Sequence, residues 1–300
     1  MAKQSSTVPK KASPAAKKPA ATARKKPAAR KSTKKKKGFD YPWRTTLVIV
    51  LLVLFSPLYY GYVLNFFTGA VRWVKDIGEN PHYRTYHSFQ IRIPARYKIH
   101  GIDVSYAQGH IDWQRVKQME EDSVHISFAF IKATEGMLIV DSYFKRNWRE
   151  AAKNGIVCGA YHFFRPQKNG QWQARFFMQN VTFEKGDLPP VVDVETLDGV
   201  SPANMRKELQ QFLTTVERKT GVRPIIYTGI SYYQDYLAGH FEDYPLWIAH
   251  YNQPELQIDK SVKWHFWQHS ETARVNGINH TVDFDAFNGD SLAFTRMLIR

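Results

Sequence analysis

Short apolar runs rich in β-forming residues recur along the chain from about residue 100 onward, and helix-forming stretches separate the first several of them. Eight such runs are expected to be strands: HGIDVS (100–105), HISFAFIKAT (125–134), IVCGAYHFF (156–164), PPVVDVE (189–195), RPIIYTG (223–229), PLWIAHY (245–251), KWHFWQHS (263–270) and HTVDFDAF (280–287). The last three are joined by shorter and less helical segments.

Three of the separating stretches carry helix start and stop signals. Asp112 is expected to cap the first, Asp141 a second that ends at Gly155, and Ser201 a third that begins with Pro202 and stops at Gly221. Strands alternating with helices predict an α/β protein, and eight of them favour a β/α barrel, TIM-like but with reduced helices toward its C-terminal end. An open doubly wound sheet is the alternative. No Gly-rich phosphate loop follows the first strand, so nucleotide binding is not expected.

A second pattern precedes the strands: 21 consecutive residues without a charge, from Leu47 to Phe67. At about 1.5 Å per residue this run is long enough to cross the roughly 30 Å hydrocarbon core of a bilayer. Trp43 and Trp73 flank it, as interfacial aromatic residues often do. We predict a transmembrane helix over residues 45–67; a buried helix and a cleaved signal peptide are the alternatives.

The charge of the chain is concentrated in front of this run. The formal net charge is +15, and residues 1–44 hold 15 Lys and Arg against one acid, Asp40. With almost nothing to bury, this segment is expected to be a disordered basic arm. Its position predicts a single-pass membrane protein with a cytoplasmic N-terminus and a catalytic domain in the periplasm or extracellular space. The arm either only sets this orientation or also contacts anionic lipid or nucleic acid.

The rest of the chain has little net charge. Residues 71–300 carry 27 Lys and Arg and 26 Asp and Glu, so no nucleic-acid partner is expected for the folded domain. The single cysteine, Cys158, excludes an internal disulfide framework. Residues 68–96 are poorly periodic and are interpreted as a linker, which places the folded domain at 97–300.

Carboxylates stand where the predicted strands end. Asp193 and Glu195 alternate with valines in the fourth run, so the two acids share one face of a strand, with Cα atoms about 6.5 Å apart. Asp103 lies in the first run and Asp283 in the eighth. Catalytic groups of a barrel gather at the strands' C-terminal ends, and close, desolvated carboxylates raise at least one pKa toward neutral pH. A pair of acids held by Lys or Arg is the alternative.

Aromatic side chains lie at the same level of the strands, and some of them can stack on the apolar faces of sugars: Tyr161, Tyr227, Trp247, Tyr251, Trp264 and Trp267. Gln268 and His162 add groups that can hydrogen-bond to sugar hydroxyls. The scattered histidines are interpreted as structural, and neither a metal nor a cofactor is expected. Acids and aromatic residues in this arrangement suggest glycoside hydrolysis.

These runs resemble, in order, the motifs of glycoside hydrolase family 25, the lysozyme family of N-acetylmuramidases: GIDVS (101–105), FIKATEG (130–136), GAYHFF (159–164), PPVVDVE (189–195), PIIYTG (224–229), LWIAHY (246–251), FWQHS (266–270) and VDFDAF (282–287). The resemblance extends over residues 99–290. It implies a β/α barrel with some antiparallel closure. It also implies hydrolysis of the β-1,4 bond between N-acetylmuramic acid and N-acetylglucosamine in peptidoglycan.

The resemblance also implies roles by position. Asp193 and Glu195 match the family's D-x-E pair, Asp103 its first-strand aspartate and Asp283 its last-strand aspartate, while Tyr161, Tyr227, Trp247 and Gln268 match positions in the saccharide groove. Asp285 departs from the pattern, in which Asn is expected. The family's cell-wall-binding repeats are absent from the sequence, which leaves the predicted membrane span as the localising device.

The resulting hypothesis makes Glu195 the general acid, and Asp193 the residue that orients the substrate's 2-acetamido group while its oxygen attacks the anomeric carbon. Asp103 would add negative potential or position Asp193. The alternative mechanism makes Asp103 the base that activates water, with inversion. Two other functions stay open: a glycan-binding module without turnover, and a hydrolase of another class, such as a chitinase, that shares D-x-E chemistry.

Overall fold

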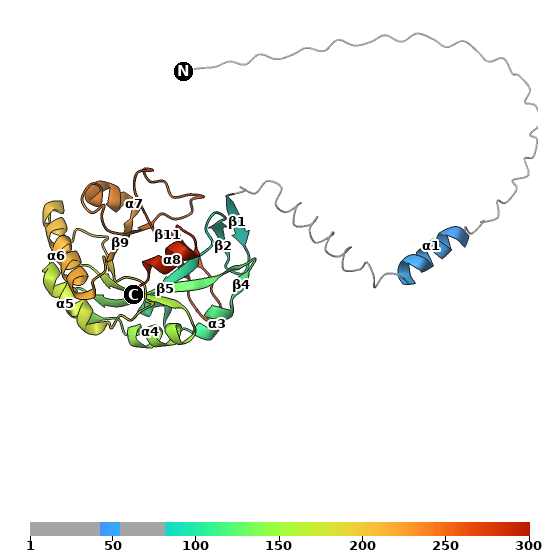
Figure 1. Ribbon diagram of the computed structural model, residues 1–300, viewed down its shortest axis with the longest axis horizontal. Helices are drawn as coiled ribbons and strands as arrows, with labels where there is room; N and C mark the ends of the chain where they lie inside the picture. Colours follow the sequence, from blue (N-terminus) through green and yellow to red (C-terminus); the bar gives the residue numbers. More distant parts are fainter. Residues whose placement is uncertain (1–42, 55–81) are drawn as a thin grey trace, which may run out of the picture. The chain divides into compact units, whose positions relative to one another are not determined.

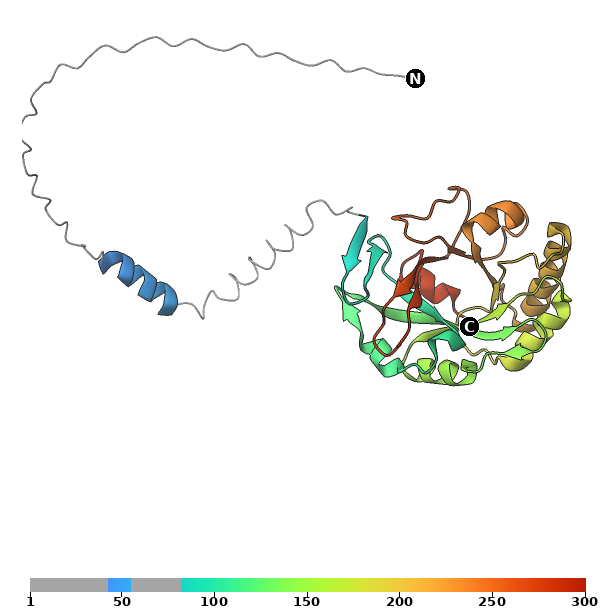
Figure 2. The same ribbon diagram turned by 180° about the vertical axis from the view of Figure 1, so that it is seen from behind.

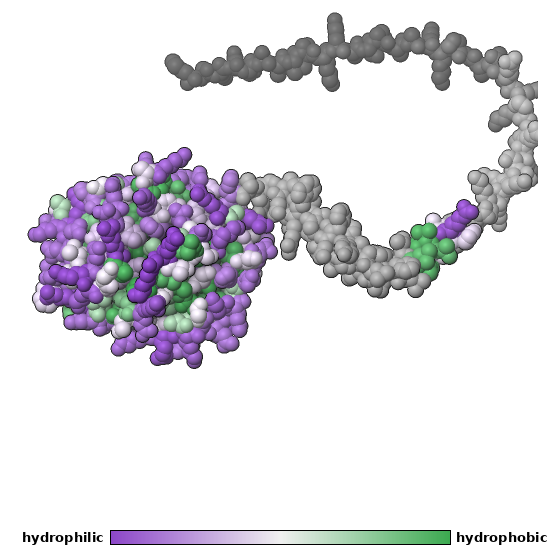
Figure 3. Space-filling model, viewed as in Figure 1, coloured by the Kyte–Doolittle hydropathy of each residue, from purple (hydrophilic) through white to green (hydrophobic). Residues whose placement is uncertain are grey.

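The computed structural model describes residues 43–54 and 82–300, which fall in two separate units of the chain (Figure 1). Helix α1 (Trp43–Leu54) has a single charged residue, Arg44, and its side chains from Leu47 to Leu51 are apolar and exposed (Figure 3). Across the described ranges, no helix combines the length and the apolar character needed to cross a membrane. Most of the predicted basic arm and the rest of the predicted span lie outside the described residues.

Eight strands close into a barrel in chain order: β3 (His100–Val104), β5 (Val124–Glu135), β7 (Val157–Phe163), β8 (Val191–Asp193), β9 (Ile225–Gly229), β10 (Leu246–Ala249), β11 (Phe266–Ala273) and β12 (Val282–Phe287). Each predicted run overlaps one of these strands. Pairing of β3 with both β5 and β12 closes the ring, which excludes an open doubly wound sheet. Short strands β4 (Glu120–Glu121) and β6 (Ile139–Val140) pair with the two ends of β5.

The ring departs from a TIM barrel at its last strand. The first seven strands of the ring, β3, β5 and β7 to β11, run parallel, whereas β12 is antiparallel to both β11 and β3. A parallel twelfth strand would need a crossover of about a dozen residues or more, usually a helix. Here the loop 274–281 turns the chain straight back. The TIM-like expectation is therefore wrong, while the expected antiparallel closure is confirmed.

Helices pack around part of the barrel (Figure 1 and Figure 2). They are α3 (Trp113–Gln118), α4 (Phe144–Lys153), α5 (Gly170–Asn180), α6 (Pro202–Thr220), α7 (Ile230–Tyr232) and α8 (Ser291–Met297), with a 3-10 turn at Tyr106–Gln108 and a π-helical turn at Tyr233–Leu237. The pattern did not single out α5. It correctly predicted the caps of two helices: Asp112 caps α3 and Ser201 caps α6.

The predicted cap at Asp141 is wrong. Helix α4 begins after Tyr143, which forms no side-chain cap. The Asp141 carboxylate instead accepts hydrogen bonds from the backbone N–H groups of Tyr106 at 2.8 Å and Tyr143 at 2.9 Å. It thereby ties the loop after β3 to the start of α4.

Aromatic side chains fill the interior of the barrel. The rings of Phe128, Phe130 and Phe266 contact one another with centroids 5.1–5.5 Å apart. Phe294 of α8 closes one end, 5.7 Å from Phe128. Gly101 makes this filling possible, because a Cβ at that position would lie 2.3 Å from the Phe128 ring. A second apolar core lies between the strands and the helices. Polar side chains gather instead at the end of the barrel where the parallel strands terminate.

An antiparallel hairpin of β1 (Tyr83–Tyr86) and β2 (Ile91–Pro94) precedes the barrel. Phe89 in its turn is fully buried and packs on Phe284 with ring centroids 5.3 Å apart. The predicted linker 68–96 is therefore wrong in its described part, which is a piece of the folded domain. Its two strands have four residues each, too few for a repeating pattern to show.

Candidate active site

Polar side chains gather in a cavity of about 280 Å³ at the C-terminal ends of the parallel strands. It is lined by Asp103, Ser105, Lys132, Tyr161, Phe163, Asp193, Glu195, Tyr227, Trp247, Tyr251, Gln268, Glu271 and Asp283. They include Tyr251 and all eight residues to which the resemblance assigns roles, whereas Trp264, Trp267 and His162 do not line this cavity. The sequence interpretation missed Ser105, Lys132, Phe163 and Glu271. Lys132 and Phe163 lie near the ends of predicted strands, which is the signal that would have found them.

Strand β8 and its continuation carry the acid pair. The valines on either side of Asp193 are buried in the outer core, and Asp193 and Glu195 both line the cavity, as strand alternation predicts. Asp193 is buried, whereas Glu195 is exposed at the cavity mouth. Across the ring, the register of β3 and β12 sets Asp103 directly beside Asp283. Four carboxyl groups from three places in the ring therefore share one cavity.

Gln268 on β11 fixes one wall of the cavity through three hydrogen bonds. Its Nε2 donates to Asp103 Oδ2. Its Oε1 accepts from the hydroxyls of Tyr227 at 2.8 Å and Tyr251 at 2.6 Å. Because both ends of the amide are engaged, its orientation is set, and Asp103 is held in place from β11 rather than from its own strand.

Trp247 lines the cavity but is only 2% exposed. Its ring packs between those of Phe130 and Tyr227, with centroid separations of 4.2 and 4.3 Å. Its Nε1 donates to Asp285 Oδ1 at 2.8 Å. Trp247 therefore fixes the cavity wall and offers little free ring face for a sugar, while the half-buried Tyr251 offers more.

The four carboxyl groups have raised pKa values. Burial, with the nearby Asp283 and Asp285, raises the pKa of Asp103 well above its usual range. Burial and Glu195 do the same for the pKa of Asp193, opposed by Lys132. Burial, with Glu271 and Glu195, raises the pKa of Asp283 to about 7.

The pKa of Glu195 is also raised. Desolvation by the cavity walls is the main cause, and the Tyr227 hydroxyl and Lys132 oppose it. Desolvated carboxyl groups that share one cavity disfavour each other's ionisation. The cavity therefore suits general acid catalysis, and its negative charge can stabilise a cation.

Lys132 belongs to an ion network at the edge of the cavity. Its Nζ donates to Glu135 at 2.8 Å, and Arg165 pairs with the same carboxylate at 2.5 Å and with Asp198 at 3.4 Å. Within the described residues, neither Asp193 nor Glu195 forms an ion pair. The alternative of an acid pair held by Lys or Arg is therefore wrong, and the one lysine that lines the cavity is engaged by Glu135.

Replacing Asp285 with Asn should stabilise the fold at neutral pH. Burial and Asp283 raise the pKa of Asp285 well above its usual 3.8. The folded chain thus keeps a proton that the unfolded chain releases, and stability falls as the pH rises above about 3.8. Within residues 82–300, Asp285 Oδ2 has no hydrogen-bond partner. Asn keeps an oxygen for Trp247, so urea unfolding at pH 7 should require about 1 kcal/mol more free energy.

The pH dependence supplies the control for this variant. Below about pH 3.8 the carboxyl is protonated in both states, so the two proteins should have the same stability there. A variant that is less stable than the parent at pH 7 would show instead that the ionised Asp285 supports Trp247.

The geometry agrees with sequence comparison. The family model described as Glycosyl hydrolases family 25 matches residues 102–278, which include Asp103, the β8 acid pair and Gln268. The chain belongs to glycosyl hydrolase family 25.

Curated relatives and solved structures are similar to most of the folded domain. The uncharacterized protein YegX of Escherichia coli K12 is 47% identical over 246 residues, covering 82% of this chain and 90% of that protein. Lysozyme M1 of Streptomyces globisporus is 35% identical over 207 residues, covering 64% and 69%. A family 25 glycosyl hydrolase from Bacillus anthracis matches with a TM-score of 0.63 and 31% identity, covering 73% of this chain and 99% of that one. The lysozyme from Streptomyces coelicolor matches with a TM-score of 0.61 and 34% identity, covering 66% and 96%.

Proposed function

We propose that this protein is a peptidoglycan hydrolase that cleaves the β-1,4 bond between N-acetylmuramic acid and N-acetylglucosamine. The observation that carries the proposal is the cavity in which Asp103, Asp193, Glu195 and Asp283 converge, with Asp103 held by Gln268. Membership of a glycoside hydrolase family and similarity to proteins named lysozymes support the substrate class. The convergence of acids with raised pKa values favours catalysis over a glycan-binding module without turnover.

Glu195 acts as the general acid in this proposal. It stands at the exposed mouth, where it gives its proton to the glycosidic oxygen as the bond from that oxygen to the anomeric carbon breaks. The 2-acetamido oxygen attacks the same carbon and forms a cationic oxazolinium intermediate. Glu195, now ionised, then takes a proton from the water that opens the intermediate.

Asp193 orients the acetamido group and stabilises the cation. Asp193 lines the cavity, and its Oδ1 has no hydrogen-bond partner within the described residues, which leaves one hydrogen bond for the acetamido N–H to supply. Asp103 is already bound by Gln268 and supplies negative potential.

The test is a mass-spectrometric analysis of fragments released from purified peptidoglycan by the full-length chain. A muramidase leaves muramic acid at the new reducing end. Reducing-end glucosamine would show a different bond specificity and would overturn the proposal. Cleavage of chitin chains at the same rate as peptidoglycan would favour the chitinase-like alternative.

We also propose that the chain is anchored in a membrane through residues 45–67, with its basic N-terminus in the cytoplasm and the barrel on the outer side. The uncharged run up to Phe67 and the 15 bases of residues 1–44 support this arrangement. The outer side is also where peptidoglycan lies. The test adds protease to cells whose outer barrier has been opened while the inner membrane stays intact. Digestion of the barrel under these conditions would support the arrangement. A barrel that stays protected until the inner membrane is lysed would overturn it.

A further inference from the structure

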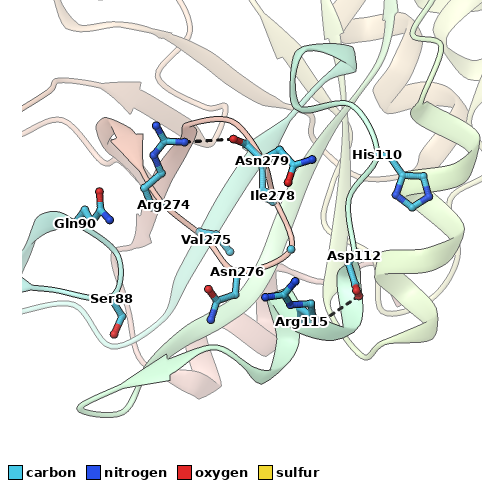
Figure 4. Close-up of a pocket in the computed structure, with 11 residues that line it drawn as sticks. Ser88, Gln90, His110, Asp112, Arg115, Arg274, Val275, Asn276, Ile278 and Asn279 are labelled. Atoms are coloured by element: carbon cyan, nitrogen blue, oxygen red, sulfur yellow. Dashed lines mark hydrogen bonds between the residues drawn. The ribbon is translucent and has the colours of Figure 1, made fainter.

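Two more cavities lie beside the β1–β2 hairpin, which precedes the family match at residues 102–278. The hairpin cavity, of about 290 Å³, is lined by Tyr83, Gln90, Ile91, Arg92, Asn252, Ser270 and Thr272. The turn cavity, of about 450 Å³, lies at the hairpin turn and includes Ser88, Gln90, Arg115 and Arg274 in its lining (Figure 4). Gln90 lines both, so the two cavities meet at this residue.

Strand β11 leads from the catalytic cavity to both of them. Gln268 and Glu271 line the catalytic cavity, Ser270 and Thr272 line the hairpin cavity, and Arg274, directly after the strand, lines the turn cavity. At about 3.3 Å per residue, Gln268 and Arg274 are at most roughly 20 Å apart. The three cavities therefore follow one another along a single strand.

The hairpin is held rigidly against this strand. The backbone N–H of Arg274 donates to the carbonyl of Phe89 at 2.9 Å, and Phe89 itself is fully buried. On the other side of the turn, the N–H of Ser88 donates to Glu121 at 2.8 Å. A wall that is already ordered costs little entropy when a ligand binds against it.

The charge changes sign along this path. The catalytic cavity is lined by five acids and one base, Lys132. The hairpin cavity is lined by one base, Arg92, and no acid. In the turn cavity Arg115 and Arg274 lie on different walls, and the one acid, Asp112, caps α3 (Figure 4). Such a path fits a ligand that is a neutral sugar at one end and carries carboxylates farther on.

We propose that the hairpin and turn cavities bind the anionic stem peptide of the peptidoglycan strand under attack. Arg92 and Arg274 contact its carboxylates. The inference rests on the proposed muramidase function and extends it to substrate selection. The stem peptide is attached to the muramic acid at the scissile bond, so it leaves the catalytic cavity beside that sugar. Peptide-bearing strands are then preferred over bare glycan strands.

The test measures binding by the full-length chain carrying Glu195→Gln, so that turnover does not consume the ligand. Two ligands are titrated calorimetrically: soluble glycan fragments with stem peptides, and the same fragments after removal of the peptides. Arg92→Glu should weaken binding of the peptide-bearing fragments about tenfold and leave bare fragments unchanged, and Arg274→Glu should act in the same direction. The difference in affinity for peptide-bearing fragments between Arg92→Glu and the unchanged hairpin should shrink at high salt.

Arg84→Glu is the matched control, because Arg84 is an exposed arginine of the same hairpin that lines neither cavity. It should bind both ligands like the parent. The inference would be overturned if Arg92→Glu weakened binding of both ligands equally or of neither. It would also be overturned if the Glu195→Gln chain without a further substitution bound bare and peptide-bearing fragments equally. A parent that binds neither ligand would overturn the proposed function as well.

Discussion

Replacing Glu195 with Gln should lower the rate of peptidoglycan cleavage by at least about a hundredfold. Gln has nearly the same shape but cannot give a proton to the glycosidic oxygen. Among the four converging acids, Glu195 is the one at the exposed mouth of the cavity, where a glycan chain can reach it, and desolvation raises its pKa. The measurement is the initial rate at which the full-length chain releases soluble fragments from purified sacculi.

Glu255→Gln is the matched control, because Glu255 is exposed on the β10–β11 loop and does not line the catalytic cavity. It should cleave at the rate of the parent, and thermal unfolding should show that both variants are folded. The activity of the parent should also fall as the pH rises through the raised pKa of the acid. If the Glu195→Gln variant keeps more than a tenth of the activity, another residue donates the proton. Asp283 is then the next candidate, because its pKa is about 7.

Alternation along short strands made the barrel and its acids predictable. Every predicted run overlaps a strand, and the D-x-E spacing put Asp193 and Glu195 on one face because successive side chains of an extended segment alternate. The direction of the last strand was not readable from the residues alone, since alternation is the same in parallel and antiparallel strands. It was implied only by the family resemblance.

Contacts between distant residues were beyond the sequence. Gln268 and Asp103 are 165 positions apart, and nothing local in either segment shows that one amide binds that carboxylate. Lys132 and the hairpin were missed for different reasons. A lysine inside an apolar run is typical of a surface residue. Strands of four residues are too short to show an alternating pattern of apolar and polar side chains. These features line the catalytic cavity and the proposed stem-peptide site beside it.

Replacing Asp193 with Asn should also lower the rate by about a hundredfold, because the carboxylate no longer offsets the positive charge of the oxazolinium intermediate. Asp103→Asn is the comparison that separates the two mechanisms. Under substrate assistance, Asp193→Asn is the more damaging change. If Asp103 is the base that activates water, Asp103→Asn is the more damaging, because the inverting reaction then loses its base.

Product stereochemistry provides an independent measurement of the same point. Two displacements at the anomeric carbon, first by the acetamido oxygen and then by water, leave the initial product in the β configuration of the substrate. Proton NMR of the first product should therefore show the β anomer before mutarotation. An initial α anomer would reveal a single displacement by water and would leave Asp193 without the role that its buried, unpartnered Oδ1 suggests within the described domain. Substrate with the acetamido group of the attacked sugar removed should likewise resist cleavage, since the internal nucleophile is then missing.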